Sequence, residues 1–272
     1  MKRLLYIELL KTLNYPTFKT LLALYTLLFL LVIFVATSIN LNIQGINIER
    51  LFQTPHIWDT FAWLGKWFNL LLGILVVLLV TNEFQFRTFR KQLIDGLARN
   101  ELIAGKILIV ATIGLYSTLV VFVSGLIFAI SNSSSFGPSD LLDGLATAPR
   151  LYLQTLAFTL MAMLFAFLFR NAALSIVSYI LFFFPLEPII RALLPDAWDG
   201  FMPIKAMSSL TPMPDIVGIA FGDALLDQGS ASSALQAPPP DGLSLLPMAA
   251  ITLGYSALFI IISNFMVQRR NF

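Results

Sequence analysis

Long apolar runs recur along the chain, and each is about as long as a helix that crosses a lipid bilayer. The hydrocarbon core of a bilayer needs roughly 20 consecutive apolar residues per helix. Six runs meet this requirement, at about 18–39, 61–81, 103–130, 151–169, 172–190 and 245–267. In lipid every backbone amide must be satisfied within its own segment, so such runs predict helices. We therefore expect an all-α polytopic membrane protein, with 1–272 forming a single transmembrane domain.

The composition agrees with this class and excludes several others. Of the residues, 58% are hydrophobic and 12% are charged, whereas soluble domains carry about 25% charged residues. The net charge of +2 is too small to suggest a nucleic-acid partner. Because the chain contains no cysteine, disulfides, thiolate metal sites and cysteine nucleophiles are excluded. The N-terminal segment lacks a continuous apolar region and a small-residue cleavage site, so we interpret it as retained.

The distribution of basic residues predicts the orientation of the spans. With the N-terminus in the cytoplasm, 12 of the 17 Lys and Arg residues fall on the inner side. They are Lys2, Arg3, Lys11, Lys19, Arg87, Arg90, Lys91, Arg99, Lys106, Arg170, Arg269 and Arg270. Cytoplasmic loops carry an excess of Lys and Arg, so both termini are expected in the cytoplasm.

An amphipathic helix is expected before the first span, over Lys2–Asn14. Leu5, Leu9 and Leu13 recur at four-residue spacing, and Tyr15-Pro16 separates them from the span. We interpret this helix as an anchor along the inner membrane interface.

The first two outer loops, at about Asn40–Thr60 and Ser131–Arg150, are of moderate length. The third outer segment lies between the fifth and sixth spans, at about Glu187–Ser244, and is the longest. Pro185 and Pro188 should kink the end of the fifth span. The apolar stretch Phe201–Leu226 is interrupted by three prolines, which favours an interfacial or re-entrant helix over a span. Only Gln228–Gly242 has the composition of flexible coil.

Glu187 and Arg191 lie where the outer turn after the fifth span should begin. They are four residues apart and could pair on one helix face. We expect a structural ion pair at the interface in preference to a substrate contact.

The basic segment Asn82–Lys106 lies between the second and third spans. If it is helical from about Glu83, Phe86, Phe89, Leu93, Ile94 and Leu97 form one apolar stripe, because they recur at spacings of three and four. Gly96 and Asn100 should loosen the helix before the third span. Such a segment is either an interfacial helix on anionic headgroups or a helix that docks another protein.

The residues of this segment also carry a family resemblance. In ABC-2 type permeases the second span is followed by a Glu, a Thr-x-Arg, a Leu-rich turn, an Arg and a Lys. This chain resembles that pattern, with the same elements in the same order at Glu83, Thr88, Arg90, Leu93, Arg99 and Lys106. This family forms the membrane part of ATP-binding cassette exporters, and the chain resembles it over its whole length in span number and topology. It departs from the pattern at Arg87, where the family commonly has Gly, and at 96–98, where a Pro is frequent.

The resemblance implies a coupling helix that docks in a cleft of a separate nucleotide-binding subunit. The residues expected to make this contact are Glu83, Phe86, Phe89, Arg90 and Leu93, with Arg99 at the rim. ATP and Mg would be bound by that partner, and a second permease copy or paralogue would complete the pathway. The N-terminal helix could also touch the partner, and re-entrant helices would precede the sixth span. A bacterial inner membrane is the expected location.

No ATP site is expected in this chain. Gly105-Lys106 resembles the end of a P-loop, but Asn100 and Ile107 stand where that motif needs Gly and Ser or Thr. His56 is the single histidine and has no partners for a metal site. The chain is thus expected not to be an enzyme by itself. The alternatives are a non-transporting membrane scaffold subunit of a larger complex and an intramembrane enzyme, and for the enzyme the spans offer few acids.

Overall fold

The computed structural model describes residues 2–38, 51–132, 137–214 and 245–269. These parts of the chain are helical and contain no strand. Within them, six helical runs are long and apolar enough to cross a membrane, by length and composition. The protein therefore has the make-up of an all-α, multi-pass membrane protein.

The described residues form a series of helices. They are α1 (Lys2–Leu13), α2 (Pro16–Ser38), α3 (Ile57–Gln85), α4 (Thr88–Ile94), α5 (Arg99–Asn132), α6 (Pro138–Phe169), α7 (Ala172–Leu181), the π-helix η2 (Phe182–Leu186), α8 (Glu187–Leu193), the 3₁₀-helix η3 (Asp196–Phe201), α9 (Pro203–Ser208) and α11 (Leu245–Arg269). The six candidate spans are α2, α3, α5, α6, the run from α7 to α8, and α11.

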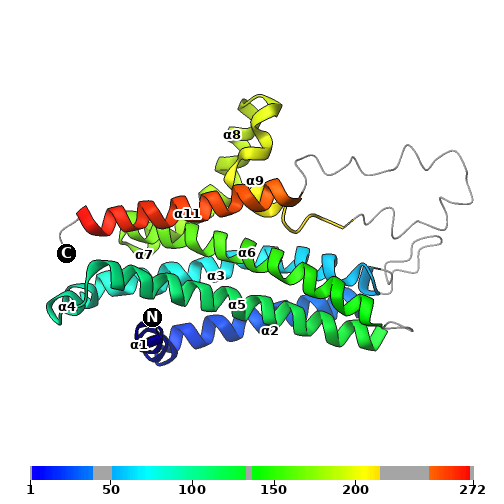
Figure 1. Ribbon diagram of the computed structural model, residues 1–272, viewed down its shortest axis with the longest axis horizontal. Coiled ribbons are helices and arrows are strands. Elements are labelled where there is room, and N and C mark those ends of the chain that lie inside the picture. The colour runs from blue at the N-terminus through cyan, green and yellow to red at the C-terminus, as the bar shows by residue number, and fades with distance from the viewer. Residues whose placement is uncertain (1, 39–50, 133–136, 215–244, 270–272) are drawn as a thin grey trace, which may run out of the picture.

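Helix α6 lies at the centre of the bundle, where it packs against α3, α5, α7 and α11. Figure 1 shows these helices running side by side, with α1 seen nearly end-on and therefore lying across them. Helix α4, the start of α7 and the end of α11 gather at one end, which we call the α4 end. Between α3 and α7 the helices approach closely, since a Cβ on Gly73 would lie 2.4 Å from the Tyr179 hydroxyl.

Each of the six predicted apolar runs overlaps one of the candidate spans, and two short breaks fall where expected. Helix α2 begins at Pro16, and only Arg170 and Asn171 separate α6 from α7. The predicted kink at the end of the fifth span is also present, because α7 passes into a π-helix that contains Pro185. Figure 1 shows α8 projecting from the side of the bundle beyond this point.

The prediction of an outer loop over Ser131–Arg150 is wrong from Pro138 onwards. Helix α6 already begins at Pro138, well before the apolar run. Proline suits the first helical position, and the Asp140 carboxylate accepts the backbone N–H of Gly137 at 2.8 Å. Apolarity marks only the part of a helix that fits lipid, so a polar helical extension escapes a search for apolar runs.

The long outer segment is described only in part. Of the predicted interfacial stretch Phe201–Leu226, the described residues form the short helix α9 and continue to Pro214. The predicted coil Gln228–Gly242 lies outside the described residues, as do residues 40–50 of the predicted loop Asn40–Thr60, whose last residues belong to α3.

Candidate functional site

The connection between α3 and α4 is a sharp break in the helix. Helix α3 ends at Gln85, and Arg87 adopts a left-handed conformation with φ of 54° before α4 begins. The Thr88 hydroxyl donates a hydrogen bond to the Glu83 carbonyl at 3.2 Å, which holds the start of α4 against the end of α3. The prediction of one continuous helix from Glu83 is therefore wrong. The position where Gly is frequent in the resembled family has the conformation that favours Gly, although an Arg occupies it here.

The break also divides the predicted apolar stripe. Phe89 is 1% exposed and packs on Phe84, with ring centroids 4.6 Å apart. Phe86 and Ile94 are 67% and 75% exposed, and Leu93 is half-buried. Because a left-handed residue separates Phe86 from α4, these side chains do not share one helical face. Gly96, with φ of 95°, ends α4 as expected, whereas Asn100 already belongs to α5.

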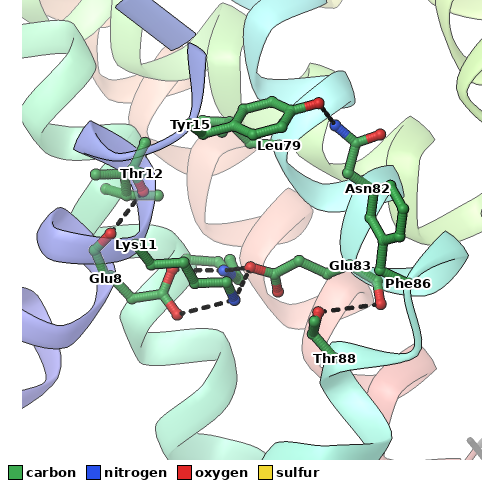
Figure 2. A pocket seen from close by; sticks show the side chains of 11 residues that line it. Glu8, Lys11, Thr12, Tyr15, Leu79, Asn82, Glu83, Phe86 and Thr88 are labelled. Atoms are coloured by element: carbon green, nitrogen blue, oxygen red, sulfur yellow. Dashed lines mark hydrogen bonds and ion pairs between the residues drawn. The ribbon is translucent and has the colours of Figure 1, made fainter. Parts of the chain in front are cut away.

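Four charged side chains meet behind this connection, and we call Glu8, Lys11, Glu83 and Lys106 the buried ion cluster. Three of them are buried, whereas Lys11 keeps 32% of its side chain accessible. The Lys106 ammonium lies 2.5 Å from a carboxylate oxygen of Glu8 and 2.5 Å from one of Glu83. Lys11 forms an ion pair with Glu83 and lies 4.0 Å from Glu8. Figure 2 shows the Glu8, Lys11 and Glu83 side chains meeting between their helices.

The buried ion cluster joins three helices that are far apart in the chain. Glu8 and Lys11 come from α1, Glu83 from the end of α3 and Lys106 from the start of α5. Lys106 is 2% exposed and Glu83 is 6% exposed, so little water reaches their contact. Two carboxylates and two ammonium groups balance one another, which offsets the loss of hydration that isolated buried charges would suffer.

Lys11 lies at the edge of the buried ion cluster. Its burial lowers the pKa of its ammonium group, and the neighbouring Lys106 lowers it further, while Glu83 and Glu8 act in the opposite direction. A cavity of about 110 Å³ lies beside it, lined in part by Tyr15 and Asn82. The Asn82 amide donates a hydrogen bond to the Tyr15 hydroxyl at 2.5 Å, which adds a second link between α3 and the α1–α2 turn.

The residues predicted to dock a partner fall into two groups. Phe86, Arg90 and Leu93 lie at or near the surface of the α4 end. Glu83 and Phe89 are inside the protein, where the first belongs to the buried ion cluster and the second to the aromatic core. Docking itself stays a prediction for all of them, but only the first group can make direct contacts in this conformation.

Arg99, the predicted rim residue, contacts another part of the same chain. Its guanidinium donates hydrogen bonds to the backbone carbonyls of Val267 and Gln268, in the last turn of α11. Positive charge stabilises the carbonyl end of a helix. Arg99 therefore ties the start of α5 to the end of the last span.

At the α8–α9 segment the predicted pairing of Glu187 with Arg191 is replaced by other contacts. The Glu187 carboxylate accepts the backbone N–H groups of Ile204 and Lys205, each at 2.8 Å, at the start of α9. Arg191 instead pairs with Asp199 of η3. Ion pairing lowers the pKa of Asp199 chiefly through the hydrogen bond from Arg191. A four-residue spacing could not reveal these partners, because both lie beyond the end of α8.

Sequence reasoning missed the role of α1 and of Lys106. Lys106 falls inside the predicted third span, and an ionisable residue within a span is a candidate functional group by default. Glu8 is an acid in an otherwise basic N-terminal segment, which was the second available signal. The helix that we interpreted as a membrane-surface anchor buries the side chains of Glu8 and Thr12 within the protein.

Among the residues that the structure describes, no group of three or more His, Cys, Asp or Glu side chains is placed to hold a metal ion. No family model matches this chain, and no curated protein matches it significantly.

Proposed function

We propose that this chain is the membrane permease subunit of an ATP-binding cassette exporter of the ABC-2 type. The observation that carries the proposal is the short helix α4, which lies between two candidate spans at the end of the bundle and exposes Arg90 and Ile94, next to the exposed Phe86 of the α3–α4 turn. The order of Glu83, Thr88, Arg90, Arg99 and Lys106 in this region resembles the coupling segment of that family.

The chemistry of α4 suits a protein partner. Exposed apolar side chains fill hydrophobic grooves, and arginine finds carboxylates at a groove rim. The partner we propose is a separate nucleotide-binding subunit that binds ATP and Mg. With both termini and α4 on the cytoplasmic side of a bacterial inner membrane, such a subunit could reach α4 directly.

The buried ion cluster connects α4 to the spans, so that a movement of α4 can be transmitted to them. Thr88 of α4 is hydrogen-bonded to the Glu83 carbonyl, and the Glu83 side chain contacts Lys106 of α5 and Lys11 of α1. A displacement of α4 would therefore act on α1, α3 and α5 together. We infer that closure of the nucleotide-binding subunits moves these helices and reorients a pathway formed by two permease copies.

The test is affinity purification of the tagged full-length chain from its native membrane, with quantification of the co-purifying ATP-binding subunit. The variant to compare is Arg90→Glu combined with Ile94→Asp, which alters exposed positions only. Phe89→Ala is unsuitable, because deleting a buried aromatic ring destabilises a protein by about 3–5 kcal/mol. We expect the variant to retain at most about a tenth of the partner, a loss of roughly 1.4 kcal/mol in binding.

Leu142→Asp is the matched control, since Leu142 is 65% exposed and lies at the start of α6, away from α4. It should leave partner recovery unchanged. Equal recovery with wild type and the α4 variant would remove α4 as the docking element. Membrane partners with no ATP-binding subunit among them would favour the scaffold function.

A further inference from the structure

A second cavity opens at the α4 end, on the side of Glu83 that faces away from α1. Its volume is about 850 Å³, and it lies between the α3–α4 turn and the α6–α7 turn. It is lined by Thr81, Glu83, Phe84, Gln85, Arg87, Phe89, Arg90, Arg170, Asn171, Ala172 and Ala173. We call it the arginine cavity. Its volume falls in the range of about 300–1,000 Å³ that is usual for small-molecule sites.

The residues that line the arginine cavity include three arginines and one acid. Arg87, Arg90 and Arg170 contribute guanidinium groups from three different parts of the chain. Among the described residues around it, Glu83 is the acidic one, and its carboxylate is already paired with Lys106 and Lys11. The Glu83 carboxylate therefore does not neutralise the arginines of the cavity, and an anion that enters the cavity can interact with them.

Two of these arginines hold an unfavourable backbone conformation. Arg87 has φ of 54° and Arg170 has φ of 53°, and no other non-glycine residue in the described part of the chain has a positive φ. Glycine or asparagine adopts this conformation at lower free energy. Strained backbone tends to occur at functional sites, and here both strained residues line one cavity.

The surroundings fix these groups and add further positive potential. The Arg170 guanidinium lies over the ring of Phe84 at 5.3 Å, so its position beside the cavity is restrained. Helix α7 begins at the cavity, where the Asn171 side chain caps the N–H of Leu174 at 3.2 Å. The first N–H groups of this ten-residue helix, at Ala172 and Ala173, carry partial positive charge that favours an anion.

We propose that the arginine cavity binds the headgroup of an anionic phospholipid. Arginine pairs with phosphate oxygens in bidentate geometry, and three arginines suit a phosphodiester whose negative charge is not cancelled by a cation in the headgroup. Phe84, Phe89, Ala172 and Ala173 give the cavity an apolar wall beside these charges, as the glycerol and acyl region of a lipid requires. Basic pockets between the inner ends of spans are known lipid sites, and this cavity lies between the ends of α3, α6 and α7.

The test uses the full-length chain, purified and reconstituted in nanodiscs that contain phosphatidylglycerol and phosphatidylcholine. Native mass spectrometry then measures which lipids each variant retains after mild delipidation. The main variant is Arg87→Asn with Arg170→Asn, because asparagine tolerates the left-handed backbone. We expect wild type to retain phosphatidylglycerol selectively and the variant to retain it at least about tenfold less, since each cation near the surface contributes several-fold in affinity.

The matched control is Lys19→Asn with Lys91→Asn, which removes two exposed charges without touching the cavity. It should change retention by less than about twofold. Arg90→Gln provides a second variant at an exposed helical position, where a fall of about threefold to fivefold is expected and folding is not at risk.

Three results would overturn the proposal. The first is equal retention by the control and the arginine variants, and the second is equal retention of phosphatidylcholine. The third is full displacement of the lipid by millimolar inorganic phosphate, which would assign the cavity to a soluble anion. If the arginine variants instead lost the ATP-binding subunit with lipid retention unchanged, the occupant would be a protein carboxylate.

Discussion

The α4 end and the α8–α9 segment both contain ion pairs, but they expose them to water very differently. Lys106 is 2% exposed and lies 2.5 Å from carboxylate oxygens of Glu8 and Glu83. Arg191 and Asp199 each leave 30% of the side chain accessible. Exposed pairs contribute about 0–1 kcal/mol, whereas loss of one member of a buried pair is strongly destabilising. The same type of contact therefore holds three helices together at the α4 end and contributes little beside α8.

Glu187 differs from both kinds of ion pair, because it is a buried carboxylate that no cation of the described residues pairs with in a salt bridge. It is 2% exposed, yet its carboxylate is satisfied by the N–H groups of Ile204 and Lys205. Hydrogen bonds to a charged group contribute about 1.5–3 kcal/mol each. The α8–α9 segment is thus held by a carboxylate at a helix start and not by its ion pair.

The largest effect is expected from Lys106→Met. This change leaves two buried carboxylates with Lys11 as the remaining cation, so the free energy of unfolding should fall by about 3–5 kcal/mol. In detergent the Tm should fall by roughly 10 °C, as measured by fluorescence-detected size exclusion after heating. Lys91→Met removes an exposed charge from α4 and should leave Tm unchanged. Equal Tm values for the two variants would contradict the structural role of the buried ion cluster.

An intermediate effect is expected from Glu187→Ala. The variant removes the acceptor for two backbone N–H groups, so α9 should loosen by about 3 kcal/mol, the lower limit for two such hydrogen bonds, while the α4 end stays intact. Hydrogen exchange followed by mass spectrometry should show faster exchange at Ile204 and Lys205 and no change in α1. Glu187→Gln keeps one acceptor oxygen and should fall between the variant and wild type. Unchanged exchange in α9 would show that its position does not depend on Glu187.

The smallest effect is expected from Asp199→Asn, and it should depend on pH. Because the pKa of Asp199 is lowered from 3.8 in the folded protein, its stabilising contribution is present above pH 3.8 and is lost as pH falls through the lowered value. Near neutral pH the variant should be less stable by at most about 1 kcal/mol. Exchange rates in η3 should differ between the two proteins there and converge in strong acid. A difference that grew on acidification would have the wrong sign for this ion pair.

Most of the helices could be predicted from the sequence, but few of the contacts between them could. Runs of apolar residues predicted the six spans, and Pro16, Arg170-Asn171 and Pro185 marked their ends or kinks. The polar start of α6 was missed because a helix outside lipid needs no apolar run. Helix ends depend mainly on residues that are close in the sequence, so most of them can be predicted from short stretches of the sequence.

The candidate site depends on contacts between distant residues, and these were mostly invisible. Glu8 and Lys106 are 98 residues apart, and no local spacing relates them. Phe89 was placed on the docking face because a continuous helix was assumed, whereas the left-handed Arg87 turns it into the core. Arginine rarely adopts a positive φ by itself, so contacts in the folded protein must impose this conformation. Residue propensities therefore do not predict it.

The separation of Glu8 from its partners also has a consequence for the order in which the protein is made. Helix α1 leaves the ribosome first, but Glu83 follows 75 residues after Glu8, and Lys106 comes 98 residues after it. Until α5 is made, Glu8 and Glu83 lack the ammonium group of Lys106 that lies between them in the finished protein. The buried ion cluster is therefore complete only after the third candidate span has been synthesised, so the final position of the first helix depends on residues that are made much later.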